Sequence, residues 1–143
     1  MIFTSDSEIT HIAHGVRDLT LPKRAWTHAA HFAAAVWYLL QADHDAFTEM
    51  PGLIRAYNAA TGVPNTDHDG YHETITLASL RAAQDGLGRM CLGLPLHEKV
   101  NALLATDYGK PDWLLGYWSK EVLFSVAARR GWVDPDVQPL PFD

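Results

Sequence analysis

Histidine, glutamate and tyrosine side chains that could do chemistry gather in two short segments of this sequence. His28 and His31 are three residues apart in a run with no helix breaker, so on a helix their side chains lie about 60° apart around the axis. In the second segment, Gly70-Tyr-His-Glu-Thr74, His72 stands beside Glu73 directly after a polar loop. Two histidines from one helix and a His–Glu pair from another are ligands of the kind that a divalent metal ion takes.

The pattern predicts an interior pocket lined by histidine and glutamate that binds a small molecule, with or without a metal ion. The predicted ligands of a divalent ion (zinc, iron, nickel or manganese) are His28, His31, His72 and Glu73. Without a metal, His72 and Glu73 could act as a catalytic acid–base pair, or the same groups could bind an organic anion. No pair of these histidines makes the H-E-x-x-H pattern of zinc proteases, so the spacing leaves these alternatives open.

Three further side chains are candidates for binding a small molecule beside this set. Tyr71 could gate the pocket or hydrogen-bond a substrate, and Thr76 lies one helical turn from His72 on the same face. Arg81 could pair with an acidic substrate, with a solvated or salt-bridged arginine as the alternative.

Most of the other histidines are interpreted as mainly exposed, namely His11, His14, His44 and His97. His14 is expected to point away from the apolar side of its helix. His68 lies in the loop that precedes His72 and could close over the pocket. The sequence leaves open whether His11, His14 and His68 join it.

The structural alternative is that the histidines at positions 28, 31 and 72 are polar ties within the core. A buried imidazole needs hydrogen-bond partners for both ring nitrogens, and a neighbouring helix or a backbone carbonyl can supply them. Glu73 is favoured in a first helical turn by the helix dipole alone. On this interpretation the chain is a non-catalytic binding or interaction module, so the sequence leaves open whether it is an enzyme.

Helical periodicity extends along nearly the whole chain and predicts the elements that position these residues. A first helix is predicted over about 6–19, after a capping-box pattern from Ser5 to Glu8. A second runs from an N-cap at Thr27 to Ala42 and is apolar on every side, which predicts a central position in the fold.

The remaining helices are interrupted by prolines, glycines and a polar loop. A third is predicted over 45–60, with a kink or restart near Thr48 because Pro51 lies in its interior. A fourth covers about 71–84 and is broken by the Asp-Gly-Leu-Gly segment that follows. A short fifth opens at Pro95, and a last one runs from Ser119 to Gly131.

No stretch alternates as a strand does, so the predicted fold is an all-α helical bundle of about four main helices and one or two short ones. The length of 143 residues suits a single helical domain over residues 1–143. The apolar excess and the 5 tryptophans permit a helix-packed homodimer, although no heptad pattern requires one.

Composition argues against several classes of protein. The net charge of −6, from 11 basic and 17 acidic residues, argues against a nucleic-acid surface. No apolar run reaches the ~18 residues that a membrane span needs, and no secretory signal precedes Glu8, so a cytoplasmic protein is expected. The lone Cys91 leaves no internal disulfide, and neither a phosphate-binding glycine loop nor a G-x-S-x-G motif occurs.

Three segments carry a resemblance to known proteins: Trp-Thr-His-Ala-Ala-His (26–31), Asn-Thr-Asp-His-Asp-Gly-Tyr-His-Glu-Thr (65–74) and Leu-Phe-Ser-Val-Ala-Ala-Arg-Arg-Gly-Trp-Val-Asp-Pro-Asp (123–136). Together they resemble a family of small, functionally uncharacterised bacterial proteins that are all-helical, which implies a fold but no activity. The chain is more loosely similar to DinB-like bundles, in which histidines from separate helices hold a divalent metal. Their ligand spacing does not map onto this chain, so that similarity assigns no ligand.

The last of these segments also predicts how the chain ends. Arg129 and Arg130 close the final helix, where cations complement its dipole. Trp132 and Val133 are expected to fold back as a hydrophobic clamp on the bundle. An inward-turned Arg129 would be a partner for Glu73.

Overall fold

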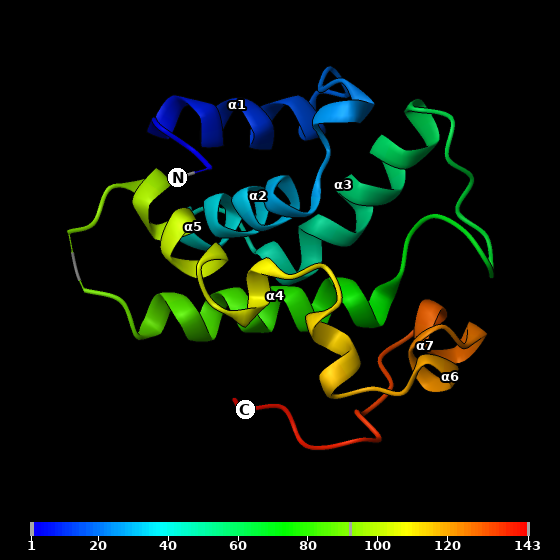
Figure 1. Ribbon diagram of the computed structural model, residues 1–143. Coiled ribbons are helices and arrows are strands. Elements are labelled where there is room, and N and C mark those ends of the chain that lie inside the picture. Colours follow the sequence, from blue (N-terminus) through cyan, green and yellow to red (C-terminus); the bar gives the residue numbers. More distant parts are fainter. Residues whose placement is uncertain (1, 92, 143) are drawn as a thin grey trace.

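Helix α2 (His28–Leu40) lies at the centre of the computed structural model, which describes residues 2–91 and 93–142. Helix α1 (Asp6–Arg17) crosses one side of it and α4 (Glu73–Gly88) lies on the opposite side (Figure 1). The central position follows from the composition of α2, whose residues from Phe32 to Tyr38 are all buried.

Helices α3 (Ala46–Ala60) and α5 (Leu96–Leu104) also pack against α2 (Figure 1). Two short helices, α6 (Lys120–Leu123) and α7 (Val126–Arg130), follow, and α7 packs against α4. Three 3₁₀ turns connect these elements, at Lys23–Ala25, Asp107–Gly109 and Trp113–Gly116. The described part of the chain contains no strand, which confirms the predicted all-α class.

The first three predicted helices are confirmed, with ends that differ by one or two residues. Ser5 and Glu8 form the predicted capping box, and the Thr27 hydroxyl accepts a hydrogen bond from the Ala30 amide as the N-cap of α2. Of the kink or restart predicted near Thr48, the restart does not occur, because α3 runs as one helix through Pro51. A proline there removes one backbone hydrogen bond close to the helix start and leaves the rest of the ladder intact.

The predicted break after residue 84 is also wrong, because α4 continues through both glycines to Gly88. Gly86 has a packing role: a Cβ atom there would lie 2.5 Å from Cδ1 of Leu103 on α5. The glycine therefore allows α4 and α5 to approach closely, and it does not end the helix.

The predicted final helix is two helices. Ser125 is extended between α6 and α7, and its hydroxyl accepts a hydrogen bond from the Ala128 amide. Ser119 caps α6 in the same way, through the Val122 amide. Each serine offers the backbone a local partner, so a second helix starts where the sequence suggests a continuous one.

The beginning of α4 is fastened to the last part of the chain. The Thr74 hydroxyl is fully buried, donates to the Gly131 carbonyl at 2.8 Å and accepts from the Val133 amide at 3.1 Å. Trp132 stacks edge-on against Trp118 with 5.7 Å between ring centroids. The predicted clamp is thus confirmed, and it positions residues 70–76.

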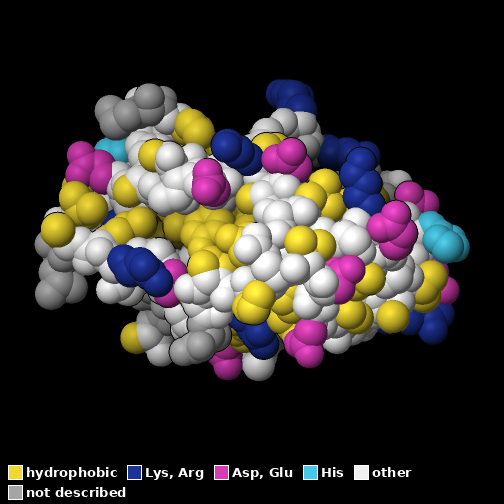
Figure 2. Space-filling view, turned by 60° about the horizontal axis from the view of Figure 1, so that its bottom comes forward, with side chains coloured by type: hydrophobic (Ala, Val, Ile, Leu, Met, Phe, Trp, Pro, Cys, Tyr) yellow, Lys and Arg dark blue, Asp and Glu magenta, His cyan; other side chains and the backbone are white. Residues whose placement is uncertain are grey.

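Surface charges of both signs surround the hydrophobic elements. On the face drawn in Figure 2, basic and acidic side chains alternate around a hollow floored by hydrophobic side chains. Within the described residues, no helix combines the length and the apolar character needed to cross a bilayer.

Substitution of Gly70 tests how closely the backbone packs at the turn before α4. Its φ is +81°, and an added Cβ would lie 2.3 Å from the Pro64 carbonyl oxygen. We expect Gly70→Ala to lower the free energy of unfolding by about 3 kcal/mol, from left-handed backbone strain and backbone overlap together. Urea denaturation measures this loss.

Gly62→Ala is the matched control, since Gly62 has φ +84° but no atom within 4 Å of an added Cβ. It should cost only about 1 kcal/mol, the strain alone. Equal losses in the two variants would contradict the close approach at Gly70.

Candidate functional site

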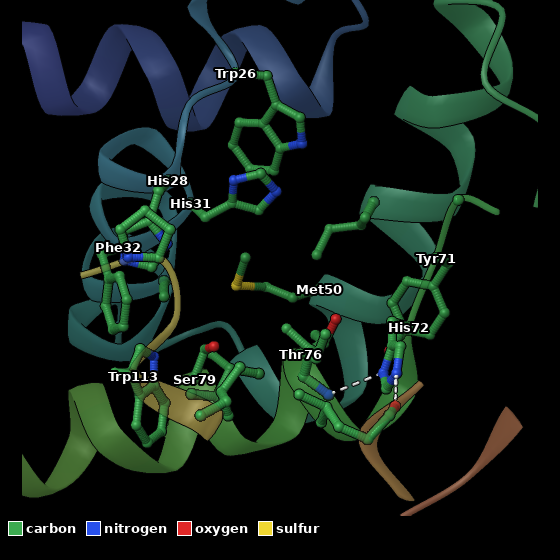
Figure 3. A pocket seen from close by; sticks show the side chains of 18 of the residues that line it. Trp26, His28, His31, Phe32, Met50, Tyr71, His72, Thr76, Ser79 and Trp113 are labelled. Carbon is green, nitrogen blue, oxygen red and sulfur yellow. Dashed lines mark hydrogen bonds between the residues drawn. The ribbon is translucent and has the colours of Figure 1, made fainter. Parts of the chain in front are cut away.

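A cavity of about 700 Å³ lies between α2, α3, α4 and the chain segment around 111–115. Its size is within the range of small-molecule pockets. Figure 3 shows rings and aliphatic side chains on several sides of it, with a few polar groups between them. The apolar part of the wall includes Trp26, Phe32, Met50, Ile54 and Trp113.

The structure brings most of the predicted site residues to this cavity. Those that line it are His28, His31, Tyr71, His72 and Thr76. The lining does not include Glu73 or Arg81. Imidazoles from α2 and from the start of α4 thus line the same cavity, and its role as a functional site stays a prediction.

His31 is the imidazole that projects into the space. Its Nδ1 donates to the Thr27 carbonyl at 2.7 Å, and its ring lies 3.8 Å from the Trp26 ring (Figure 3). Burial lowers the pKa of His31 to about 4, because the charged ring loses more solvation than the neutral one. His31 is therefore neutral at pH 7.

His28 connects α2 to the 3₁₀ turn at Asp107–Gly109. Its Nε2 donates to the Tyr108 carbonyl at 2.8 Å, and its ring stands edge-on to Phe32 at 5.2 Å. This hydrogen bond joins residues 80 positions apart in the sequence. His28 thus holds a wall of the cavity in place.

His72 is the N-cap of α4 and uses both ring nitrogens. Its Nδ1 accepts a hydrogen bond from the Ile75 amide at 3.1 Å, and its Nε2 donates to the Leu123 carbonyl at 2.6 Å (Figure 3). Burial is the main cause that lowers the pKa of His72. The predicted general acid or base is thus a tie between α4 and α6.

Glu73 and Arg81 have partners elsewhere. The Tyr71 hydroxyl donates to the Glu73 carboxylate, and the guanidinium of Arg55 lies over the Tyr71 ring at 4.2 Å. Burial is the main cause that raises the pKa of Tyr71. Arg81 stacks on Trp132 at 4.1 Å. This position does not support the predicted pairing of Arg81 with an acidic substrate.

The predicted metal ligands do not form a coordinating group. Within residues 2–91 and 93–142, no three His, Cys, Asp or Glu side chains are arranged to hold a metal ion. His72 has both ring nitrogens in hydrogen bonds within the fold, so it has no lone pair left for a metal ion, whereas His28 and His31 each use one nitrogen. A metal cofactor stays a prediction from the sequence.

The remaining histidines lie away from the cavity. His11 and His68 are exposed. His14 is half-buried and stands edge-on to Trp37 of α2 at 5.2 Å, so it does not point away from the core as predicted. None of the three is among the residues that line the cavity.

Arg129 turns inward but does not pair with Glu73. Its Nη1 donates to the carbonyls of Gly70 at 2.9 Å and Tyr71 at 3.3 Å. Beside it, Arg130 makes a two-pronged contact with Asp67, with both distances 2.7 Å. The two arginines thus hold the loop that leads into α4.

Sequence reasoning alone does not identify several lining residues. Among them are Trp26, Trp113, Met50 and Ile54. The nitrogen of Trp113 is buried without a hydrogen-bond partner. The available signal was the Trp-Thr-His pattern at 26–28, which sets an indole beside the histidine pair.

No family model, curated protein or solved structure matches the chain. The family resemblance therefore stays a prediction. Its three segments do meet in space, because 65–74 and 123–136 contact each other and 26–31 contributes Trp26, His28 and His31 to the cavity.

The lowered pKa of His31 predicts a pH-dependent stability. The unfolded chain takes up this proton near pH 6.5 and the folded chain near pH 4. The unfolded state thus binds more protons in this window, and we expect wild type to lose roughly 2 to 3 kcal/mol as the pH falls from about 6.5 to about 4.

The measurement is urea unfolding of wild type and His31→Phe at several pH values. Subtracting the two curves removes the shared titration of surface carboxylates, and the difference should follow a single group. If the free energies of unfolding of the two proteins change in parallel with pH, the pKa of His31 is not lowered by burial.

The two roles of His72 can be separated by substitution. His72→Ala removes the cap on Ile75 and leaves the Leu123 carbonyl without its donor, so we expect a loss of about 2–3 kcal/mol. His72→Asn keeps a capping oxygen and should recover about 1 kcal/mol of that loss. Chemical denaturation gives both values, and identical losses would contradict the N-cap role.

Proposed function

We propose that the protein binds a small, largely apolar molecule in the cavity between α2, α3 and α4. The observation that carries this proposal is the wall of the cavity: about 700 Å³ lined mainly by aromatic and aliphatic side chains. Such a composition favours a ligand that gains by leaving water and is oriented by one or two hydrogen bonds.

The walls are fixed by contacts that do not involve a ligand. His28 binds the Tyr108 carbonyl, His72 binds the Leu123 carbonyl, and Arg129 binds the Gly70 carbonyl. A cavity whose walls are already ordered costs little conformational entropy on binding. These ties support a preformed binding site.

The hydrogen bonds that His72 and Glu73 already make within the fold favour a binding site over acid–base catalysis by this pair. Both ring nitrogens of His72 have protein partners, and Glu73 accepts a hydrogen bond from Tyr71. A general base needs a lone pair within reach of a substrate proton. A binding module whose histidines are partly structural agrees better with these contacts.

A cytoplasmic location is part of the same proposal. Cys91 is a free, exposed thiol, which suits a reducing compartment.

Ser79→Leu tests the cavity as the binding site. Ser79 lines the cavity from α4 (Figure 3), and a leucine there would fill part of the space. With 2-naphthol as the probe, we expect wild type to shift amide resonances of lining residues in ¹H–¹⁵N NMR spectra. Ser79→Leu should weaken binding about tenfold or more without loss of stability.

Gln84→Leu is the matched control, since Gln84 is an exposed residue of the same helix. It should bind the probe as wild type does. Undiminished binding by Ser79→Leu, or no binding of any apolar probe to wild type, would refute the proposed site.

A further inference from the structure

The N–H groups of the cavity histidines are all directed at backbone carbonyls. His28 Nε2, His31 Nδ1 and His72 Nε2 each lie 2.6–2.8 Å from a carbonyl oxygen. A carbonyl oxygen only accepts hydrogen bonds, so each of these nitrogens carries the hydrogen. The second nitrogen of a neutral ring is then an acceptor, and this fixes what the imidazole offers to a ligand.

His28 and His31 each keep a second nitrogen to which the described residues make no hydrogen bond, and His31 is the one whose ring projects into the middle of the cavity (Figure 3). The second nitrogen of His72 is occupied by the Ile75 amide. Among the described residues, no hydrogen bond is made to His31 Nε2, and the ring projects into the space beneath Trp26 (Figure 3). Because burial lowers the pKa of His31 to about 4, this nitrogen remains unprotonated at pH 7.

The charges around the cavity disfavour an anion. The described residues that line it include no lysine or arginine, and the charged side chain among them is Asp112. The nearby guanidinium groups have contacts in the fold: Arg55 lies over Tyr71, Arg81 over Trp132, and Arg129 Nη1 donates to the Gly70 carbonyl while its Nε has no partner. A carboxylate or phosphate entering the cavity would lose its hydration, and no lysine or arginine in the lining would pair with it.

The other polar groups of the cavity wall do not offset this preference for an uncharged ligand over an anion. The hydroxyls of Thr76 and Ser79 can donate or accept, so they adapt to either kind of ligand group. The indole nitrogen of Trp113 is a donor, but it is buried within the wall. Asn58 also lines the cavity and donates to Asn65, and Asp112 is an exposed residue of the lining. His31 Nε2 is the acceptor that is held in one orientation among the aromatic rings.

We infer that the bound molecule is uncharged, has an apolar ring or ring-like body, and carries a hydroxyl or N–H group that donates to His31 Nε2. This inference rests on the proposed binding function and names its ligand class. Trp26, stacked on the imidazole at 3.8 Å, and the Thr27 carbonyl hold the acceptor in one orientation. An aromatic alcohol or a secondary aromatic amine has the required form.

Four matched probes test the inference: naphthalene, 2-naphthol, 2-methoxynaphthalene and 2-naphthoate. They share one ring body and differ in having no polar group, a donor, an acceptor only, or a negative charge. With wild type at pH 7, we expect 2-naphthol to bind about 5- to 10-fold more tightly than 2-methoxynaphthalene, the value of one hydrogen bond. The anion should bind most weakly, as measured by NMR titration.

His31→Phe keeps a ring against Trp26 and removes the acceptor. In this variant, 2-naphthol and 2-methoxynaphthalene should bind within about twofold of each other. Equal affinities for these two probes in wild type, or strongest binding of 2-naphthoate, would overturn the inference. Failure of all four probes to bind would instead overturn the proposed function.

A second readout does not depend on a variant that folds. In wild type labelled with ¹⁵N-histidine, the unprotonated Nε2 resonance of His31 should move when 2-naphthol is added and stay in place with 2-methoxynaphthalene. A protonated Nε2 in the free protein, or the same response to both probes, would contradict the assigned acceptor.

Discussion

The constraint on which this structure depends is that backbone carbonyls outside its long helices need hydrogen-bond donors. The last third of the chain contains short helices and turns, and such segments leave carbonyl groups that no helix satisfies. Side chains from other parts of the chain supply the donors to two of these carbonyls, since His28 reaches Tyr108 and His72 reaches Leu123. In the other direction, Arg129 of the last third donates to the carbonyls of Gly70 and Tyr71 in the loop before α4. These hydrogen bonds hold irregular backbone in place, and it can form part of a cavity wall.

The same constraint determines the chemistry of the cavity. Each histidine that gives its hydrogen to a carbonyl is less available as a proton donor, and His72 has no nitrogen left. The remaining wall is made mostly of rings and aliphatic chains. Three histidines around one space therefore produce a site with an acceptor on His31 and little charge, and not the polar centre that their number suggests.

The sequence predicts the helical class, the central place of α2 and the meeting of residues 28, 31 and 72 at one space. These follow from periodicity, caps and the cost of burying an imidazole, all of which are local properties. The partner of each nitrogen could not be predicted, because Tyr108 and Leu123 lie 80 and 51 residues away in the sequence. The continuation of α4 past Gly86 has the same cause, since that glycine is explained by Leu103 on another helix.

The attachment of the start of α4 to residues 123–133 has a consequence for biosynthesis. Before the ribosome has added residues 123–133, α1, α2 and α3 can already pack, but Thr74 and His72 have no partners. The nascent chain must keep these polar groups hydrated until residues 123–133 emerge. A chain that stops before residue 123 therefore lacks part of the cavity wall and exposes the side of α4 that residues 123–133 cover. Cellular proteases can cleave such a chain more readily than the complete fold.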